Sequence, residues 1–345
     1  MNIIILSIFA IVVVLAFLED YMQAWQKLLI LISIGITLVC VATFKPMTTA
    51  DAGTYEYYFY FNDDELIELA TEPTYIYLSR WVLAMGGEVV VMFFIYAMLS
   101  IPLKLAALWK CTPYVFTAMI VYVGIYYPLH DTVQIRCGVA TAFLLWALIP
   151  LAKRQYLKAT GLMLIATAFH YSSLAFLPVL LVGNIQITKR WKYLLGAAIP
   201  VCLALYLAHF DATMLIPGIE GKMDLYKEMS DSGDWEMYVP YKQLTFLAEF
   251  VLLYVFLFFY DTIEKNYIYA PILVKILVIE MGFITLFTEI PVLGGRLHDL
   301  FGMFNALAFT CCLYCIKPRY VARIGITVFA LGYYLIQMLD DMYFH

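Results

Sequence analysis

Apolar runs of about 15 to 20 residues recur along the whole of this 345-residue chain, and they constrain its fold more than any motif does. A helix rises about 1.5 Å per residue, so such runs cross or nearly cross a hydrocarbon layer of about 30 Å. Composition agrees, because 64% of the residues are hydrophobic and only 14% are charged. The sequence therefore predicts an all-α, polytopic membrane protein, and it excludes water-soluble enzymes and nucleic-acid binders.

The apolar runs between charge clusters predict ten spans, at about 2–18, 28–44, 88–103, 112–128, 135–152, 191–209, 243–260, 270–287, 297–316 and 322–338. A further stretch, 158–183, is interrupted at His170. One continuous helix there would place two basic clusters on opposite sides, so two short helices that turn at His170 are favoured. We expect about 11–12 segments in one integral membrane domain, 1–345. The first run lacks signal-peptide flanks and is interpreted as a span.

Charge distribution predicts the orientation of the chain. Short connections on one side carry 13 of the 21 Lys and Arg residues, whereas the other side carries 21 of the 26 acidic residues. Short basic connections are typical of the cytoplasmic side, so two long acidic loops, 45–87 and 210–242, are expected to face outward. In the first loop, Asn62 and Glu65 predict a capping box that opens a short helix. Pro73 then opens an interfacial helix that ends at Gly86.

Two arginines lie at the outer ends of spans, against the charge bias of the chain. Arg136 opens the span TVQIRCGVATAFLL beside Gly138, and Arg296 lies in GGRLHDLFGMF. Two guanidinium groups at one depth suit a phosphate or diphosphate, and a helix that starts at about 296 would add partial positive charge. The alternatives are a snorkelling interfacial cation for Arg136 and an ion pair between Arg296 and Asp299.

Other polar residues carry weaker predictions. His170 is either a structural hydrogen-bonding group or part of a site, and its outward position raises the second reading to equal weight. Among the loop carboxylates, Asp51 and Glu72 are candidate site residues, because each flanks an aromatic or interfacial helix. The chain has no HExxH, DxD or Walker-type motif, and the cluster Cys311, Cys312 and Cys315 is interpreted as helix packing. No metal and no cofactor are therefore expected.

The order of these motifs resembles a known family. The series comprises an acidic loop with Asp51 and Tyr55, Glu72-Pro73 before an interfacial helix, Arg136-x-Gly138, Phe169-His170-x-Ser172, and Arg296 with an aromatic residue five positions later. It resembles the EpsG-like branch of bacterial polysaccharide polymerases, the Wzy type that joins O-antigen or capsule repeat units, over about 45–305. Leu300 departs from the pattern, because a Tyr is expected before Phe301.

The resemblance implies a GT-C-like glycosyltransferase of the bacterial inner membrane with its site facing the periplasm. Donor and acceptor would both be oligosaccharides linked to undecaprenyl diphosphate, in contact with membrane lipid and with a chain-length regulator protein as a further candidate partner. Arg136 and Arg296 would neutralise the leaving diphosphate. His170 would orient it or take the acceptor proton, with Asp51 or Glu72 as the rival base. The remaining substrate-binding candidates are Tyr55, His298 and Asp299.

Two other classes stay open from the residues alone. A lipid-linked oligosaccharide flippase would carry charged residues at mid-membrane on several helices, and only Lys275 and Glu280 meet that description. A periplasmic glycosyl or acyl transferase that decorates the lipid-linked glycan is the closer rival. A solute transporter is disfavoured, because the sequence shows no paired, Gly- or Pro-broken helices in repeated halves.

Overall fold

The computed structural model describes residues 1–183, 185–208, 210, 244–287 and 291–339, and in these ranges the chain is helical without any strand. It divides into two compact units, Met1–Leu177 with Ile316–His345, and Pro178–Cys315. The predicted outward loop 210–242 lies almost wholly outside the described residues. The structure confirms the all-α membrane class, because six described helices are long and apolar enough to span, or seven if one bent pair counts as a span. That number is lower than the predicted 11–12, since several segments are shorter helices.

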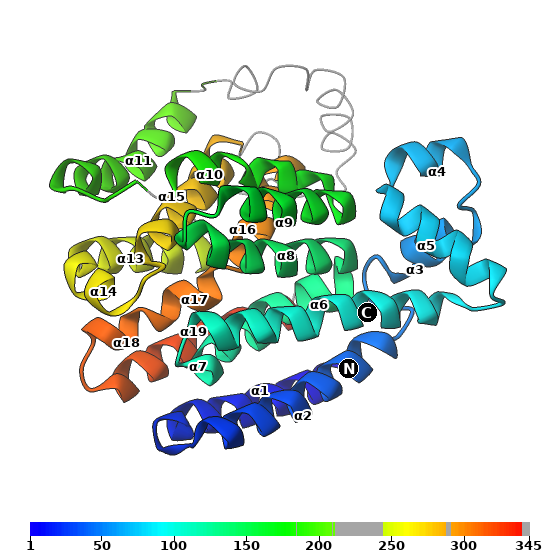
Figure 1. Ribbon diagram of the computed structural model, residues 1–345, viewed down its shortest axis with the longest axis horizontal. Helices are drawn as coiled ribbons and strands as arrows, with labels where there is room; N and C mark the ends of the chain where they lie inside the picture. Colours follow the sequence, from blue (N-terminus) through cyan, green and yellow to red (C-terminus); the bar gives the residue numbers. More distant parts are fainter. Residues whose placement is uncertain (184, 209, 211–243, 288–290, 340–345) are drawn as a thin grey trace. The chain divides into compact units, whose positions relative to one another are not determined.

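The first unit contains most of the long helices. Its elements are α1 (Asn2–Leu18), η1 (Glu19–Tyr21), α2 (Ala24–Thr43), α3 (Ala52–Tyr60), α4 (Glu65–Ala70), α5 (Pro73–Ala84), α6 (Val89–Cys111), α7 (Val115–Val121), η2 (Tyr122–Val133), α8 (Ile135–Ala152), α9 (Tyr156–Phe169), η3 (Tyr171–Phe176) and α19 (Arg319–Leu339). Helix α6 packs against α2 and α8, α8 packs against α9, and α1 and α19 pack against α7. The short helices α3 to α5 lie together at one end of this unit (Figure 1).

The second unit contains shorter and more broken helices. Its elements are α10 (Pro178–Val182), α11 (Lys189–Leu207), α13 (Leu244–Phe258), α14 (Tyr260–Asn266), α15 (Ala270–Leu286), α16 (Pro291–Gly302), α17 (Asn305–Thr310) and α18 (Cys312–Cys315). Helix α15 is central, because α10, α11, α13, α14, α16 and α17 all pack against it. Helices α13 and α14 form the bent pair, at 80°. The predicted continuous span 297–316 is wrong, since α16, α17 and α18 divide that stretch.

The first loop follows the sequence prediction in part. Helix α5 begins at Pro73, as predicted, and ends before Gly86, whose φ of 74° lies in the left-handed region that glycine adopts without strain. The predicted capping box is wrong, because Asp64 caps α4 by accepting a hydrogen bond from the backbone of Leu66 at 2.8 Å. The side chain of Asn62 instead donates to the carbonyl of Phe59 at 2.6 Å.

Ion pairs in the first unit test which connections between helices were predicted to lie on the same side of the membrane. The sequence predicts that the connections 19–27 and 317–323 lie on the same, basic side. Arg323 of the second connection contacts Glu19 at 3.0 Å and Asp20 at 2.8 Å in the first, so these two connections do lie together.

The sequence also predicts a connection of the basic side at 104–111, which is wrong, because α6 continues through these residues to Cys111. Lys104 is fully buried within α6 and pairs with Asp131 of the π-helix η2 at 2.9 Å. The sequence predicted these two residues on opposite sides of the membrane. Both instead lie inside the protein, because each buried charge has the other as its partner.

Candidate functional site

Three polar side chains of the first unit meet at Glu72. Its carboxylate pairs with the guanidinium of Arg136 through one oxygen, and the other oxygen lies 2.9 Å from Nδ1 of His170. The backbone N–H of Tyr171 donates to that second oxygen at 3.2 Å. The side chain of Glu72 is only 6% exposed, whereas those of Arg136 and His170 are 19% and 16% exposed. The carboxylate is therefore enclosed, and the two basic groups keep a path to a ligand.

Each member of this triad stands at a helix end, where local sequence signals place it. Glu72 precedes Pro73, which begins α5 because proline needs no backbone hydrogen bond at the first helical position. Arg136 is the second residue of α8. His170 ends α9 in an extended conformation, with φ −156° and ψ 112°, which confirms the predicted break. The hydroxyl of Thr74 donates to the carbonyl of Ala168 at 2.7 Å and so joins α5 to the end of α9.

A glycine sets how closely α8 approaches its neighbour. A Cβ atom on Gly138 would lie 2.3 Å from the backbone oxygen of His130 in η2, a distance that real Cβ atoms do not reach. Only glycine allows the two backbones to lie this close. Because Arg136 lies half a turn before Gly138, the same contact fixes the guanidinium relative to the rest of the unit.

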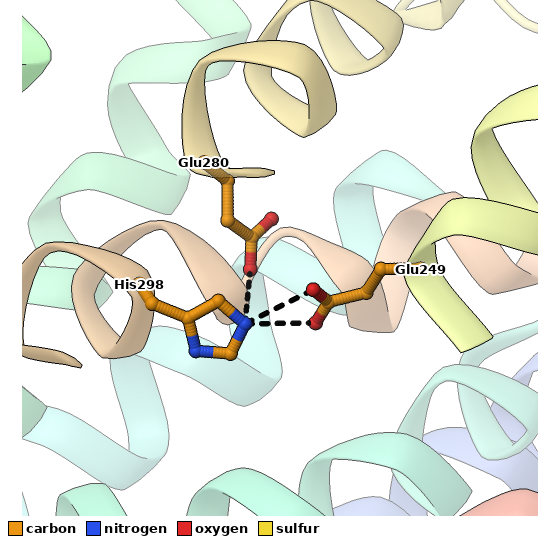
Figure 2. A group of neighbouring side chains, drawn as sticks. All are labelled: Glu249, Glu280 and His298. Carbon is orange, nitrogen blue, oxygen red and sulfur yellow. Dashed lines mark hydrogen bonds and ion pairs between the residues drawn. The ribbon is translucent and has the colours of Figure 1, made fainter. Parts of the chain in front are cut away.

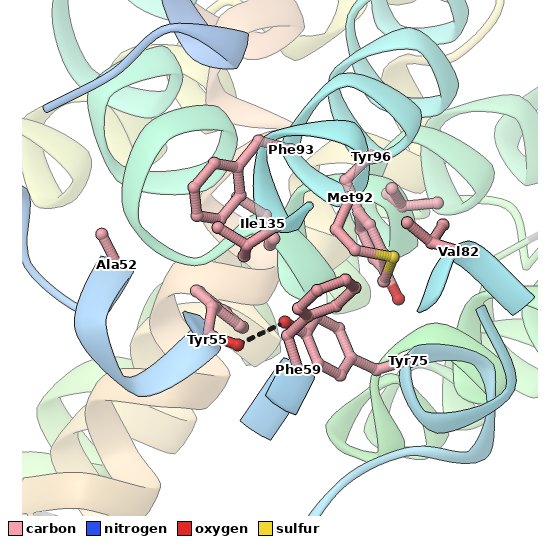
Figure 3. Close-up of a cluster of buried hydrophobic side chains, with 11 residues drawn as sticks. Ala52, Tyr55, Phe59, Tyr75, Val82, Met92, Phe93, Tyr96 and Ile135 are labelled. Atoms are coloured by element: carbon pink, nitrogen blue, oxygen red, sulfur yellow. Dashed lines mark hydrogen bonds between the residues drawn. The ribbon is translucent and has the colours of Figure 1, made fainter. Parts of the chain in front are cut away.

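An aromatic wall next to the triad is part of a cluster of buried hydrophobic side chains (Figure 3). The hydroxyl of Tyr75 donates to the backbone oxygen of Tyr55 at 2.7 Å, and the ring centroids of the two residues are 5.6 Å apart. The guanidinium of Arg136 lies 5.5 Å from the centroid of the Tyr55 ring, within the range of a cation–π contact. Tyr96 continues the wall by packing its edge against Phe169. This wall holds α3, α5 and α6 around the triad.

The electrostatics of the triad show what Glu72 can do. Burial alone would raise its pKa, but the hydrogen bond from His170 and the charge of Arg136 outweigh burial and lower the pKa to about 2. Burial raises the pKa of Tyr55 to about 12, although the Arg136 charge opposes this. A carboxylate with so low a pKa is a weak proton acceptor at neutral pH. Glu72 is therefore poorly suited to act as the base, and its carboxylate joins Arg136 to His170.

The arrangement offers an anion site beside a proton acceptor. Glu72 engages only part of the five N–H donors of Arg136, so this guanidinium is able to bind a further anion. Because Nδ1 of His170 faces Glu72, Nε2 is the ring nitrogen that remains for another partner. Asp51, the rival base, is exposed at the start of α3, and its negative charge acts on Tyr55 and on the ammonium of Lys45.

The remaining sequence candidates lie in the second unit. Arg296 is exposed on α16, but that helix begins at Pro291, so the predicted helix start at about 296 is wrong. His298 is buried against Glu249, and its Nδ1 lies 3.9 Å from Asp299. Because Arg136 and Arg296 belong to different units, a clamp made by both arginines stays a prediction.

Sequence reasoning missed Glu249, which packs between His298 and Asn305. Its signal was present, since a carboxylate in the middle of an apolar run needs a partner.

Sequence reasoning also left the role of Lys275 unassigned. The ammonium of Lys275 donates to the carbonyls of Val182 at 2.7 Å, of Gly183 at 3.1 Å, and of Ile185. Lys275 thus satisfies the carbonyls at the end of α10, which is a structural role.

Comparisons with known proteins add a family. The model of the EpsG family matches residues 27–345, which is nearly the whole chain. No curated protein and no solved structure matches this chain.

Proposed function

This chain belongs to the EpsG family, the family of Wzy-type polysaccharide polymerases, and from this premise we propose that it joins oligosaccharide repeat units carried on undecaprenyl diphosphate. Such units would supply O-antigen or capsule, with a GT-C-like arrangement in the inner membrane and the site on the periplasmic side. The observation that carries the proposal is the Glu72–Arg136–His170 triad, which places an anion-binding guanidinium beside an oriented imidazole.

In the proposed reaction, the donor glycan leaves its lipid diphosphate and moves to the acceptor hydroxyl. The acceptor oxygen forms a bond to the anomeric carbon of the donor, and the bond from that carbon to the diphosphate breaks. The diphosphate leaves with the electron pair, and Arg136 stabilises the charge that develops on it. Nε2 of His170 takes the proton of the acceptor hydroxyl. The leaving group supplies the driving force, and the triad itself needs no metal for these steps.

Glu72 acts on this reaction through its neighbours. Its carboxylate accepts the Nδ1 proton of His170, which leaves the lone pair on Nε2. A carboxylate behind an imidazole fixes the tautomer and the direction of the ring in serine hydrolases, and the same logic applies here. Glu72 is therefore a positioning residue, and His170 is favoured over Asp51 as the base. Arg296 and Asp299 remain substrate-binding candidates of the second unit, whereas His298 is buried against Glu249.

The test uses a deletion strain complemented with variants, in which both glycan ladders and lipid-linked intermediates are analysed. Arg136→Ala should abolish the ladder and leave single lipid-linked units, and Arg296→Ala should do the same if both arginines contact the diphosphate. Arg80→Ala is the matched control, because Arg80 is an outward arginine whose partners Asp63 and Glu68 are exposed. Protein level is measured by immunoblot in every strain.

The outcomes separate the three candidate classes. A normal ladder in Arg136→Ala at normal protein level would show that the guanidinium has no part in the reaction. In the deletion strain, absence of exported units would indicate a flippase. A full ladder with altered sugars would indicate a decorating transferase. Comparing His170→Ala with Asp51→Asn decides the base, because only loss of the true base should abolish polymerisation at saturating substrate.

A further inference from the structure

A second group of polar side chains lies in the other unit and is not used by the proposed reaction. Glu249 of α13, Glu280 of α15 and His298 of α16 point toward one another (Figure 2). Nε2 of His298 lies 3.0 Å and 3.2 Å from the two oxygens of Glu249, and 3.6 Å from one oxygen of Glu280. Their side chains are 1%, 0% and 10% exposed.

Among the described side chains of this group, acidic residues outnumber basic ones. Two carboxylates face one imidazole in a buried setting, where an unpaired carboxylate is costly. The amide of Asn305 donates to Glu249 at 2.8 Å and to Glu280 at 3.0 Å, which relieves part of that cost. The second oxygen of Glu280 is buried and accepts no hydrogen bond from any residue that the structure describes. A proton or a cation would satisfy this oxygen.

The spacing of the donor atoms suits a metal ion. One ligand atom from each of the three residues can be chosen so that all lie within 4.8 Å of one another. Two ligands that are each about 2.1 Å from an ion, at tetrahedral or octahedral angles, stand roughly 3.0 to 3.4 Å apart. The contacts of His298 to both carboxylates, at 3.0 Å and 3.6 Å, fall at or close to this range. The two atom pairs at 3.0 Å and 3.6 Å can therefore become ligand pairs with small side-chain shifts.

We propose that Glu249, Glu280 and His298 bind one divalent transition-metal ion, Zn²⁺ or Mn²⁺. Imidazole favours transition metals over Mg²⁺ and Ca²⁺, which prefer oxygen ligands alone. The double positive charge neutralises both carboxylates, and Asn305 holds them in place from behind. Because the ligands come from α13, α15 and α16, the ion joins three helices of the second unit. Its role is structural, so it is additional to the chemistry at Arg136 and His170.

The first experiment measures metal on the full-length protein purified in detergent without chelator from cells supplied with Zn²⁺ and Mn²⁺. Mass spectrometry of the elements should find close to one transition-metal ion per chain. Removing the ion should lower the thermal unfolding midpoint, and adding Zn²⁺ or Mn²⁺ back should restore it. Absence of bound ion, with no response of the midpoint to either metal, would overturn the proposal and leave a hydrogen-bonded cluster that shares a proton. An equal response to Mg²⁺ or Ca²⁺ would overturn the choice of a transition metal.

Variants then assign the ligands. Glu280→Gln and His298→Gln should each weaken binding at least 100-fold, whereas Asn305→Ala should weaken it about 10- to 100-fold as a residue behind the ligands. Glu264→Gln is the matched control, because Glu264 is an exposed carboxylate of the same unit, and it should bind metal normally. Normal binding in both ligand variants would exclude this site. If a ligand variant fails to fold, the add-back experiment on the native protein still decides. Metal content and glycan ladders are separate measurements, so failure of one proposal does not imply failure of the other.

Discussion

Neutralising Glu72 is the sharpest test of the triad, because this carboxylate holds both basic groups. Glu72→Gln keeps the size of the side chain and one acceptor oxygen but removes the negative charge. Lowering a carboxyl pKa from 4.5 to about 2 corresponds to about 3 kcal/mol of favourable interaction in the folded state. Breaking one side of a buried ion pair typically costs about 3–5 kcal/mol, which agrees with that value. We therefore expect Glu72→Gln to be less stable than the native protein by about 3 kcal/mol.

A double-mutant cycle shows whether the cost comes from the pair. Arg136→Met leaves Glu72 without its guanidinium and should destabilise the protein by a similar amount. The double variant, Glu72→Gln with Arg136→Met, leaves no unpaired charge and should be no less stable than the worse single variant. Additive losses in the double variant would refute the reasoning. Thermal unfolding in detergent reports each value, and Glu88→Gln, at an exposed carboxylate, is the control that should not change the midpoint.

Activity distinguishes positioning from simple stability. Glu72→Gln should shorten the glycan ladder even at a temperature where the variant is fully folded, because Arg136 and His170 lose their common anchor. Glu72→Asp, which restores the charge, should recover part of the ladder. A normal ladder in folded Glu72→Gln would show that Glu72 only stabilises the fold.

Three further predictions concern other contacts. Glu72 has a lowered pKa in the folded protein, so its contribution to stability is present above about pH 4.5 and is lost as the pH falls toward 2. The thermal unfolding midpoint of the native protein should therefore fall over this range more than that of Glu72→Gln. Gly138→Ala should lower the free energy of unfolding by about 1–3 kcal/mol and shorten the ladder, because the new Cβ collides with the η2 backbone. Gly161→Ala, in open space on α9, should be neutral or slightly stabilising. Equal unfolding midpoints of the two variants would contradict this. Lys104→Met should cost about 3–5 kcal/mol, and adding Asp131→Asn should recover part of it; a stable single variant would show that the pair is unimportant.

Local signals in the sequence were enough for several elements near the triad. Pro73 and Gly86 bound α5, and the polar residues from His170 onward end α9, because proline, glycine and polar breaks act within a few residues of the chain. The same approach failed at Asn62, since Asp64 offered a competing cap only two residues later. It also failed at 297–316, where apolar composition cannot show that a helix is interrupted.

By itself, the sequence determined that the chain is an all-α membrane protein and that Glu72, Arg136 and His170 stand at helix ends, because run length and helix-end residues are local properties. Only the tertiary structure decided that these three meet, since Glu72 lies 64 positions from Arg136 and 98 from His170. It likewise brought Glu249, Glu280 and His298 together from three helices. A buried charge demands a partner, but which helix provides that partner depends on packing, and packing is not encoded in the spacing of residues along the chain.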